Sequence, residues 1–251
     1  MSDFNLQFQN VSSYYDKEQI LKDLNLVINN GEVVSIIGPN GSGKSTFLKT
    51  IMNQVKHTGS VTLNGINTYE MLERISFMPQ SGDIDQTYPL SVKDVVSMAF
   101  LKKNHLLKFT SNHEFDIQKY LNALKIEDIE SKSISELSGG QLQRVFLART
   151  LAREGDLVLL DEPFNEVDVL TEKLIINQIE ELRLNGKTIL ISNHDLPIAQ
   201  KISTKILLLN KKIVAYGNPK DVFSKEALFE AFGDKIVVVS DKDFTIPDHV
   251  Y

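Results

Sequence analysis

The chain contains no cysteine among its 251 residues. Disulfide bonds and thiolate metal sites are therefore excluded, and the composition fits a reducing compartment such as the cytoplasm. No apolar run approaches the roughly 20 residues that a membrane-spanning helix needs. The N-terminal residues Met1–Asn5 also lack the basic and apolar regions of a signal peptide. We therefore expect any membrane association to depend on a partner protein.

An excess of positive charge is also missing, because the net charge is −6 at pH 7. That balance argues against a nucleic-acid binder that works through a general basic surface. No internal repeat or low-complexity segment is present. The length suits one large domain, or a domain with an inserted lobe.

The hydrophobic pattern predicts an α/β fold. Alternation between Phe4 and Ile28 indicates half-buried strands. Nearly continuous apolar runs, which indicate strands covered on both faces, occur at Val33–Ile37, Leu157–Leu160 and Thr188–Ile191. Helical spacing occurs at Lys44–Gln54 and Val169–Leu184, and a terminal hairpin is indicated at Ile206–Leu209 and Ile213–Tyr216. Strands that alternate with helices predict a mainly parallel sheet with flanking crossover helices.

The region from about Ser81 to Glu136 has a different pattern. It lacks buried-strand runs and shows helical segments near Val92–Leu101 and Glu114–Leu124. We therefore expect a core formed by residues 1–80 and 156–232, and a mostly helical inserted lobe at about 81–155. Residues 233–251 are expected to form a C-terminal tail.

A glycine-rich segment follows the first buried strand and reads Gly38-Pro39-Asn40-Gly41-Ser42-Gly43-Lys44-Ser45. It matches the phosphate-binding loop pattern in the required strand–loop–helix context. Glycines let backbone N–H groups approach phosphate oxygens, and the start of the following helix favours an anion. Lys44 is expected to reach the β- and γ-phosphates of a nucleotide, and the Ser45 hydroxyl to bind Mg²⁺. The predicted nucleotide-binding residues are Gly38, Asn40, Gly41, Ser42, Gly43, Lys44, Ser45 and Thr46. The alternative is an ordinary glycine-rich turn before a helix.

Two acids end the second buried run. Asp161 lies at the strand end, which predicts a carboxylate at the sheet's C-terminal edge, where it could hold Mg²⁺. Glu162 points differently and could accept a proton from an attacking water. Taken alone, the pair could also be two solvated acids at a strand end.

The segment Leu137–Gln141 reads Leu-Ser-Gly-Gly-Gln and lies between the phosphate loop and the acids. With these motifs in this order, nearly the whole chain resembles the nucleotide-binding subunit of an ATP-binding cassette (ABC) transporter. The resemblance also covers Tyr15, Gln80, Asp168 and His194. It implies a P-loop NTPase core, an N-terminal antiparallel β-subdomain and an inserted helical lobe.

The resemblance implies a role for each motif residue. Tyr15 would stack on adenine, although Tyr14 next to it, or packing of Tyr15 on the core, are alternatives. Gln80 would contact Mg²⁺ and the attacking water, and His194 would contact the γ-phosphate and orient Glu162. The residues that would bind ATP held by a second subunit are Ser138, Gly139, Gly140 and Gln141, and Asp168 would also belong to the nucleotide site.

The same resemblance implies partners. Two chains in a head-to-tail arrangement, most simply a homodimer, would complete two ATP sites. A separate integral membrane permease would carry the cargo, after delivery by an extracellular substrate-binding protein. We therefore expect this chain at the cytoplasmic face of a bacterial cell membrane, with ATP and Mg²⁺ and without nucleic acid.

One loop departs from the family pattern. Many relatives carry Ser-Ala-Leu-Asp where this chain has Asn165-Glu166-Val167-Asp168. In the family this loop lies at the dimer interface. Glu166 could therefore pair with a group across the dimer, or repel phosphate and help the dimer reopen.

The segment after Gln80 bears on the cargo. It resembles the corresponding part of bacterial manganese, zinc and iron importers at Ile84-Asp85, Tyr88-Pro89, Val92 and Asp94–Val96. We therefore predict ATP-driven import of a divalent transition-metal ion. Three alternatives stay open. The chain could serve an importer of another cargo, such as haem, a siderophore or a vitamin, or it could serve an exporter. It could also be a soluble ABC ATPase of the iron–sulfur assembly type. We interpret His57, His105, His113 and His249 as surface or core residues, because their spacing offers no metal cluster.

Overall fold

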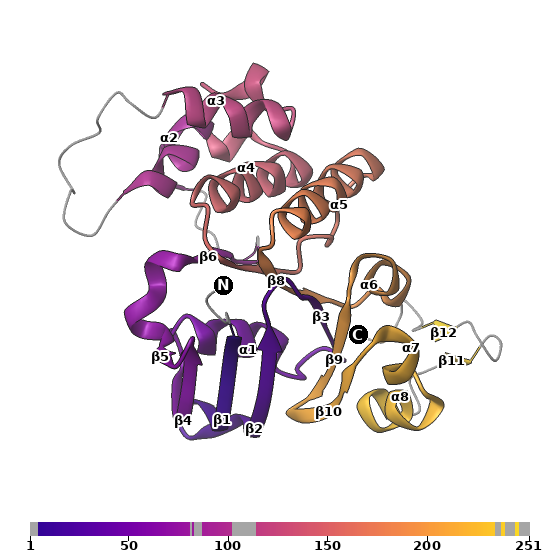
Figure 1. The fold of residues 1–251 in the computed structure, drawn as a ribbon. Coiled ribbons are helices and arrows are strands. Elements are labelled where there is room, and N and C mark those ends of the chain that lie inside the picture. Colours follow the sequence, from indigo (N-terminus) through magenta and orange to yellow (C-terminus); the bar gives the residue numbers. More distant parts are fainter. Residues whose placement is uncertain are drawn as a thin grey trace. The chain divides into compact units, whose positions relative to one another are not determined.

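A computed structural model describes residues 5–80, 82, 87–101, 114–233, 237–238 and 244–245 (Figure 1). The chain divides into two compact units: unit 1 comprises residues 1–72 and 182–251, and unit 2 comprises residues 73–181. Among the described residues, none of the helices has the length and apolar character needed to cross a bilayer. The Ile84-Asp85 pair and the histidines His105, His113 and His249 lie outside the described residues.

Unit 1 begins with a four-stranded antiparallel sheet in the order β2-β1-β4-β5. The strands are β1 (Asn5–Tyr15), β2 (Glu18–Asn29), β4 (Lys56–Leu63) and β5 (Ile66–Asn67). Leu6 lies opposite Ile28 on one side and Leu63 on the other, and all three are fully buried. The ring of Phe8 stacks on Phe47 of the first helix at a centroid distance of 4.6 Å. The predicted half-buried strands are therefore confirmed, with their apolar face packed on a helix.

Unit 1 also contains three parallel strands and one antiparallel strand next to them. β3 (Val33–Ile37) pairs in parallel with β8 (Thr188–Asn193) and with β9 (Lys205–Asn210), and β10 (Lys212–Gly217) is antiparallel to β9. Every residue of β3 and β8 is buried. The strands predicted at Val33–Ile37 and Thr188–Ile191 and the predicted terminal hairpin are thus confirmed.

Helix α1 (Lys44–Ile51) is shorter than predicted, because it ends three residues before Gln54. Asn53 adopts a left-handed backbone with φ 55°, and the Gln54 N–H donates to the carbonyl of Lys49 at 2.9 Å. A left-handed residue with this bond closes a helix and satisfies its last carbonyls. Asparagine tolerates that conformation, which hydrophobic periodicity alone does not reveal.

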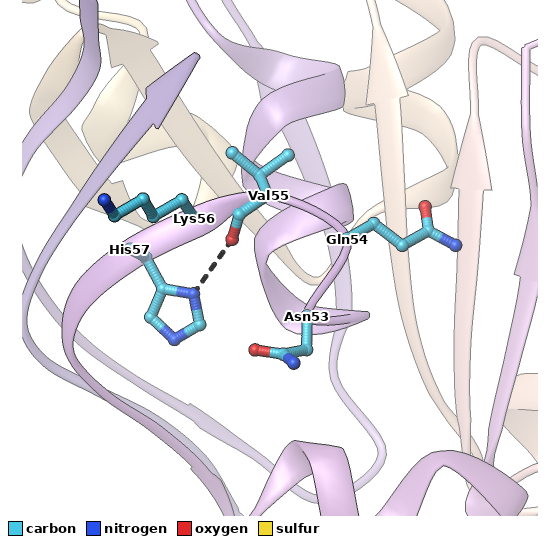
Figure 2. Close-up of a pocket in the computed structure, with 5 residues that line it drawn as sticks. All are labelled: Asn53, Gln54, Val55, Lys56 and His57. Atoms are coloured by element: carbon cyan, nitrogen blue, oxygen red, sulfur yellow. Dashed lines mark hydrogen bonds between the residues drawn. The ribbon is translucent and has the colours of Figure 1, made fainter. Parts of the chain in front are cut away.

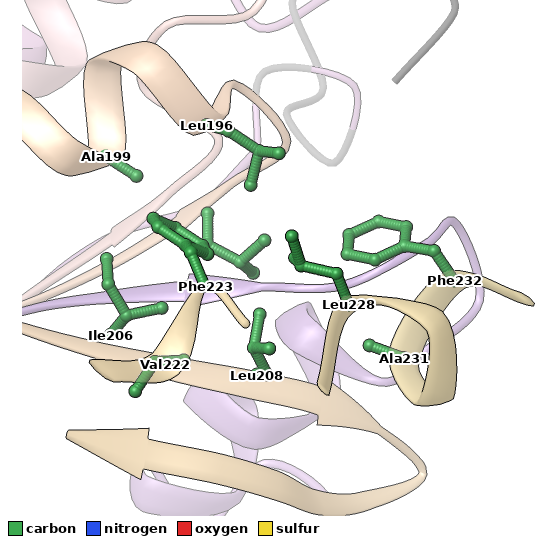
Figure 3. Close-up of a cluster of buried hydrophobic side chains, with 10 residues drawn as sticks. Leu196, Ala199, Ile206, Leu208, Val222, Phe223, Leu228, Ala231 and Phe232 are labelled. Atoms are coloured by element: carbon green, nitrogen blue, oxygen red, sulfur yellow. The ribbon is translucent and has the colours of Figure 1, made fainter. Parts of the chain in front are cut away.

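Three short helices pack against β3 and β9. They are α6 (Leu196–Ile202), α7 (Pro219–Val222) and α8 (Lys225–Phe232). They bury a shared apolar cluster against the strands (Figure 3). Its labelled members are Leu196, Ala199, Ile206, Leu208, Val222, Phe223, Leu228, Ala231 and Phe232. This cluster anchors the segment after β10 to the core of unit 1. Further on, β11 (Val237–Val238) pairs antiparallel with β12 (Phe244–Thr245).

Unit 2 combines a parallel strand pair with helices. β6 (Ile75–Met78) pairs with β7 (Leu157–Asp161), and β7 matches the predicted run at Leu157–Leu160. The helices are α2 (Val92–Ser97), α3 (Glu114–Ala123), α4 (Gly139–Ala152) and α5 (Val169–Leu184, of which the last three residues belong to unit 1). After α2 the chain continues as a 3₁₀ turn at Met98–Phe100, within the predicted helical segment. The helical character of the inserted lobe and the α/β fold class are confirmed.

Candidate functional site

The phosphate loop leaves the carboxyl end of β3 and enters α1 at Lys44. Ile37, the last strand residue, lies opposite Asn193 of β8 and Leu208 of β9. The loop is therefore held at the carboxyl edge of three parallel strands, where α/β proteins bind ligands. The Ser42 N–H donates to the Pro39 carbonyl at 3.1 Å, which closes a turn inside the loop.

Two glycines of this loop are required for packing reasons. A Cβ at Gly38 would lie 2.0 Å from the Leu209 carbonyl oxygen, so only hydrogen fits between β3 and β9. Gly43 caps α1 with φ 99°, and a Cβ there would lie 2.5 Å from Cδ2 of Leu21. The loop backbone can follow this path only with glycine at both positions.

Lys44 lies in the first turn of α1 and is 5% exposed. Its ammonium donates to the carbonyls of Gly38 at 2.8 Å and Pro39 at 3.2 Å. The amine is thus held over the loop, where a phosphate group bound to the loop amides would find a positive charge. Ser45 is the second residue of α1 and is half-buried.

The predicted His194 directly follows β8, and its side chain is exposed. Asn193 Oδ1 accepts the Asp195 N–H at 2.9 Å, which forms a side-chain turn across His194. Asp195 Oδ1 in turn accepts the Ile198 N–H at 2.8 Å and caps α6. These two hydrogen bonds fix the backbone on either side of His194, at the same strand edge as the phosphate loop.

Tyr15 ends β1 and is 46% exposed. That exposure excludes the alternative in which Tyr15 packs into the core. Tyr14 is half-buried and pairs with Gln19. Of the two, Tyr15 offers the more open ring face.

In unit 2, Asp161 ends β7 and is fully buried. Glu162 follows with a left-handed φ of 49°, a conformation that residues other than glycine rarely adopt. The Gln80 amide donates to Glu162 Oε2 at 2.8 Å. Two predicted catalytic residues are thus brought together by a direct hydrogen bond.

Glu162 is also held through its backbone. The buried side chain of Gln143, on α4, donates to the Glu162 carbonyl at 3.2 Å. The strained backbone and the two amide contacts fix the orientation of the carboxylate. Gln143 was not among the predicted site residues, and no sequence signal distinguishes it from the rest of its helix.

The Leu137–Gln141 segment forms the start of α4. The Ser138 hydroxyl accepts the Gln141 N–H at 3.3 Å, while the Ser138 N–H donates to Gln141 Oε1 at 3.0 Å. This reciprocal pair is a capping box. It presents the glycines Gly139 and Gly140 on the first turn of the helix, where a helix end favours anions.

Asp168 lies beside that turn, because a Cβ at Gly140 would meet Asp168 Oδ2 at 3.2 Å. Its carboxylate accepts the Thr171 N–H at 2.7 Å and the Thr171 hydroxyl at 3.2 Å, at the start of α5. The hydrogen bond from the Thr171 backbone N–H is the main cause that holds the pKa of Asp168 below its usual range, and the bond from the Thr171 hydroxyl adds to it. A charged Asp168 and the Ser138–Gln141 turn are therefore neighbours in unit 2.

Glu166 precedes Asp168 by two residues, is exposed and has a left-handed φ of 52°. Val169 and Leu170, at the start of α5, are also exposed, at 68% and 47%. The departure from the family pattern thus lies on an open surface that combines a carboxylate with apolar side chains.

A hollow of about 380 Å³ lies beyond the C-terminal end of α1, lined by Asn53, Gln54, Val55, Lys56 and His57 (Figure 2). In it His57 Nδ1 lies 3.1 Å from the Val55 carbonyl. It contains none of the predicted site residues. Within the part of the chain that the structure describes, three or more His, Cys, Asp or Glu side chains nowhere gather as a metal site.

Sequence reasoning also missed the supporting residues around His194. Asp195, followed by Pro197 at the second helical position, is a helix-start signal that was present in the sequence. Asn193 could have been found by the same logic, since asparagine commonly forms such turns.

Comparison with known proteins places these features in a family. The ABC transporter family model matches residues 21–165. The manganese transport system ATP-binding protein MntB of Bacillus subtilis is 38% identical over 241 residues, covering 95% of this chain and 96% of that protein. MntB of Halalkalibacterium halodurans is 36% identical over 239 residues, with 95% and 96% coverage.

A solved structure shows the same fold. The dimeric structure of a bacterial ABC transporter cassette matches with a TM-score of 0.75 and 27% identity, covering 85% of this chain and 98% of that one. The family match covers more than half of the chain, and both MntB relatives align over nearly their whole length. The chain therefore belongs to the ABC transporter family, as one of its ATP-binding ATPase subunits.

Proposed function

We propose that this chain powers the import of a divalent transition-metal ion, with manganese as the first candidate. The observation that carries this proposal is the 36–38% identity, over 95% of the chain, to ATP-binding proteins named for manganese transport. The Tyr88-Pro89 and Asp94–Val96 features agree with it. Of these, Asp94 completes the capping box that starts α2, with the Asp94 N–H donating to the Ser91 hydroxyl at 3.1 Å.

In the proposed function, unit 1 binds the nucleotide. The loop amides and the Lys44 ammonium receive the phosphates, and the exposed ring of Tyr15 stacks on adenine. His194, exposed and fixed by the Asn193 turn, donates to the γ-phosphate. Asn40, Gly41 and Thr46 belong to the same loop and helix start and complete the contacts.

Unit 2 supplies the groups for hydrolysis. Glu162 accepts a proton from the water whose oxygen attacks the γ-phosphorus, while the bond to the β-phosphate oxygen breaks. Gln80 holds the Glu162 carboxylate through the 2.8 Å hydrogen bond. Because that bond and the Gln143 contact fix the carboxylate before reaction, little reorganisation is needed in the transition state.

The proposed Mg²⁺ ligands are the Ser45 hydroxyl, the Gln80 amide oxygen and the Asp161 carboxylate. These are oxygen donors, which Mg²⁺ prefers, and a fully buried carboxylate such as Asp161 favours a nearby cation. When bound, the ion would neutralise charge on the phosphates.

We further propose that two copies of this chain form the working ATPase. The Ser138–Gln141 capping box presents an anion-binding helix start in each copy, which ATP bound to the other copy would occupy. The relative solved as a dimer supports this arrangement. The exposed Val169 and Leu170 beside Asp168 are suited to burial in such a contact.

The cargo would cross the membrane through a separate integral permease, with an extracellular binding protein delivering it. In this arrangement the chain would lie at the cytoplasmic face of a bacterial membrane. Among the described residues there is neither a membrane-spanning helix nor a group of three or more His, Cys, Asp or Glu side chains that could hold the cargo ion.

The test is transport by the whole complex. The chain would be co-expressed with its membrane permease, reconstituted in vesicles with ATP, and assayed for uptake of labelled Mn²⁺, Zn²⁺ and Fe²⁺. The Glu162→Gln complex is the matched control. ATP-dependent Mn²⁺ uptake that the control lacks supports the proposal. Faster uptake of Zn²⁺ or Fe²⁺ would assign that ion as the cargo instead of Mn²⁺. If no membrane permease co-purifies with the chain in detergent, the proposed role in transport is contradicted.

A further inference from the structure

The turn between β9 and β10 contacts the phosphate loop through the backbone. The Lys211 N–H donates to the Ser42 carbonyl at 2.9 Å. The Lys211 carbonyl in turn accepts the N–H of Lys22, on β2, at 2.8 Å. A single turn residue thus connects the loop to a strand of the antiparallel sheet.

Close packing completes this arrangement on both sides of the loop. The Leu209 carbonyl, two residues before Lys211, occupies the space where a side chain at Gly38 would stand. Leu21, the neighbour of Lys22, fills the corresponding space at Gly43 and is fully buried. The loop is therefore enclosed by a ring of contacts that runs from β2 to Lys211, to the loop, and back to β2.

Lys211 can make both bonds because of its backbone conformation. Its φ is 58°, in the left-handed region, which turns its N–H and carbonyl toward different neighbours. Glycine and asparagine accept this conformation readily, whereas a β-branched residue does not. The side chain of Lys211 takes no part in either bond.

The turn is supported from behind by α8. The Asn210 amide donates to the Ala231 carbonyl at 3.0 Å, and the Lys212 ammonium lies 2.8 Å from Glu230. Ala231 belongs to the buried cluster of Figure 3. The turn therefore cannot shift freely without disturbing that core.

We propose that Lys211 is a positioning residue for ATP: its backbone, held by α8, sets the path of the phosphate loop. The inference rests on the proposed binding of nucleotide at this loop. It assigns to the β9–β10 hairpin a role in nucleotide affinity, in addition to its place in the fold. The effect passes through Ser42 and Gly38, so it concerns the loop amides rather than the chemistry of hydrolysis.

The test compares Lys211→Val with Lys211→Gly. Valine disfavours the left-handed backbone and should displace the N–H, so the KM for ATP and the Kd of a non-hydrolysable ATP analogue should rise about tenfold. The kcat at saturating ATP should stay within about twofold, since no group that acts on the reaction is changed. Lys211→Gly should keep wild-type affinity, which a simple need for the lysine charge would not allow.

Asn64 provides the control, because it has a left-handed φ of 55° in the β4–β5 turn and donates its N–H to the Asn5 carbonyl, away from the loop. Its side-chain Oδ1 also accepts the Asn5 N–H at 2.9 Å. Asn64→Val should therefore lower the unfolding midpoint at least as much as Lys211→Val does, yet bind the analogue normally. If Lys211→Val does not fold, Lys211→Ala serves, with a smaller rise in Kd. A folded valine or alanine variant with wild-type affinity overturns the positioning role. Failure of the wild-type protein to bind ATP would instead overturn the proposed nucleotide site.

Discussion

Replacing Gly38 with alanine tests whether close packing, rather than backbone flexibility, requires glycine at the start of the phosphate loop. The added Cβ would stand 2.0 Å from the Leu209 carbonyl oxygen and 2.7 Å from the Ser42 hydroxyl. Non-bonded heavy atoms pack at about 3.5 Å or more. The β3 and β9 backbones, paired at Ile37 and Leu208, would therefore have to separate by roughly an ångström or more.

Such overpacking costs about 1–3 kcal/mol. Alanine also stabilises the folded state by about 0.4–1 kcal/mol, because it lowers the conformational entropy of the unfolded chain. We therefore expect Gly38→Ala to lower the free energy of unfolding by about 1–2 kcal/mol, or the Tm by about 2–8 °C for a chain of this size. ATP affinity should fall as well, since the loop leaves β3 at this residue.

The assay is denaturant unfolding together with binding of a non-hydrolysable ATP analogue. Gly217→Ala is the control, because its Cβ would meet only a side-chain methyl of Val222, at 3.3 Å. That control should stay within about 0.5 kcal/mol of wild type. Equal stability of the two variants would refute the packing argument.

Three further predictions concern single residues of unit 2. Glu162→Gln should still bind ATP but lose about 10²–10⁴-fold in turnover, because the proton acceptor is gone; steady-state ATPase assays check this, and normal turnover would contradict the role. The lowered pKa of Asp168 means that its charged form stabilises the fold at neutral pH, and that this contribution is lost as the pH falls through the folded-state pKa, below the unfolded value of about 3.9. The stability difference between wild type and Asp168→Asn should therefore shrink on acidification, measured by denaturant unfolding from pH 7 to pH 3, and a constant difference would argue against it. Glu166→Ala should weaken ATP-dependent dimerisation if Glu166 pairs across the dimer, or strengthen it if Glu166 repels phosphate; sedimentation with ATP decides, and unchanged dimer affinity and hydrolysis rate would remove both ideas.

Local patterns predicted much of the fold, because burial leaves a period in the sequence. The continuous runs at Val33–Ile37 and Leu157–Leu160 became fully buried strands. The end of α1 was predicted three residues too late. The helix ends where Asn53 adopts a left-handed backbone, and the hydrophobic pattern of the sequence does not show this. The motif residues could be proposed from the sequence for a related reason: chemistry fixes their types and spacing.

Contacts made by the backbone were beyond prediction. The bond from Lys211 to Ser42 uses no side-chain atom, so neither residue's identity records it. The buried Gln143 on α4 belongs to no motif, yet its side-chain amide donates to the Glu162 carbonyl. Such pairs become visible only when the strands and helices are placed in space.

The contacts of Lys44 have a consequence for how readily ATP could bind. Its ammonium is buried and already bonded to two loop carbonyls. Removing water from a charged amine is costly, and here folding has dehydrated it beforehand. An arriving phosphate would exchange partners with the Gly38 and Pro39 carbonyls instead of stripping a hydration shell. If Lys44 binds the phosphates as proposed, the cost of dehydrating its ammonium would fall on the folding of the chain and not on the binding step.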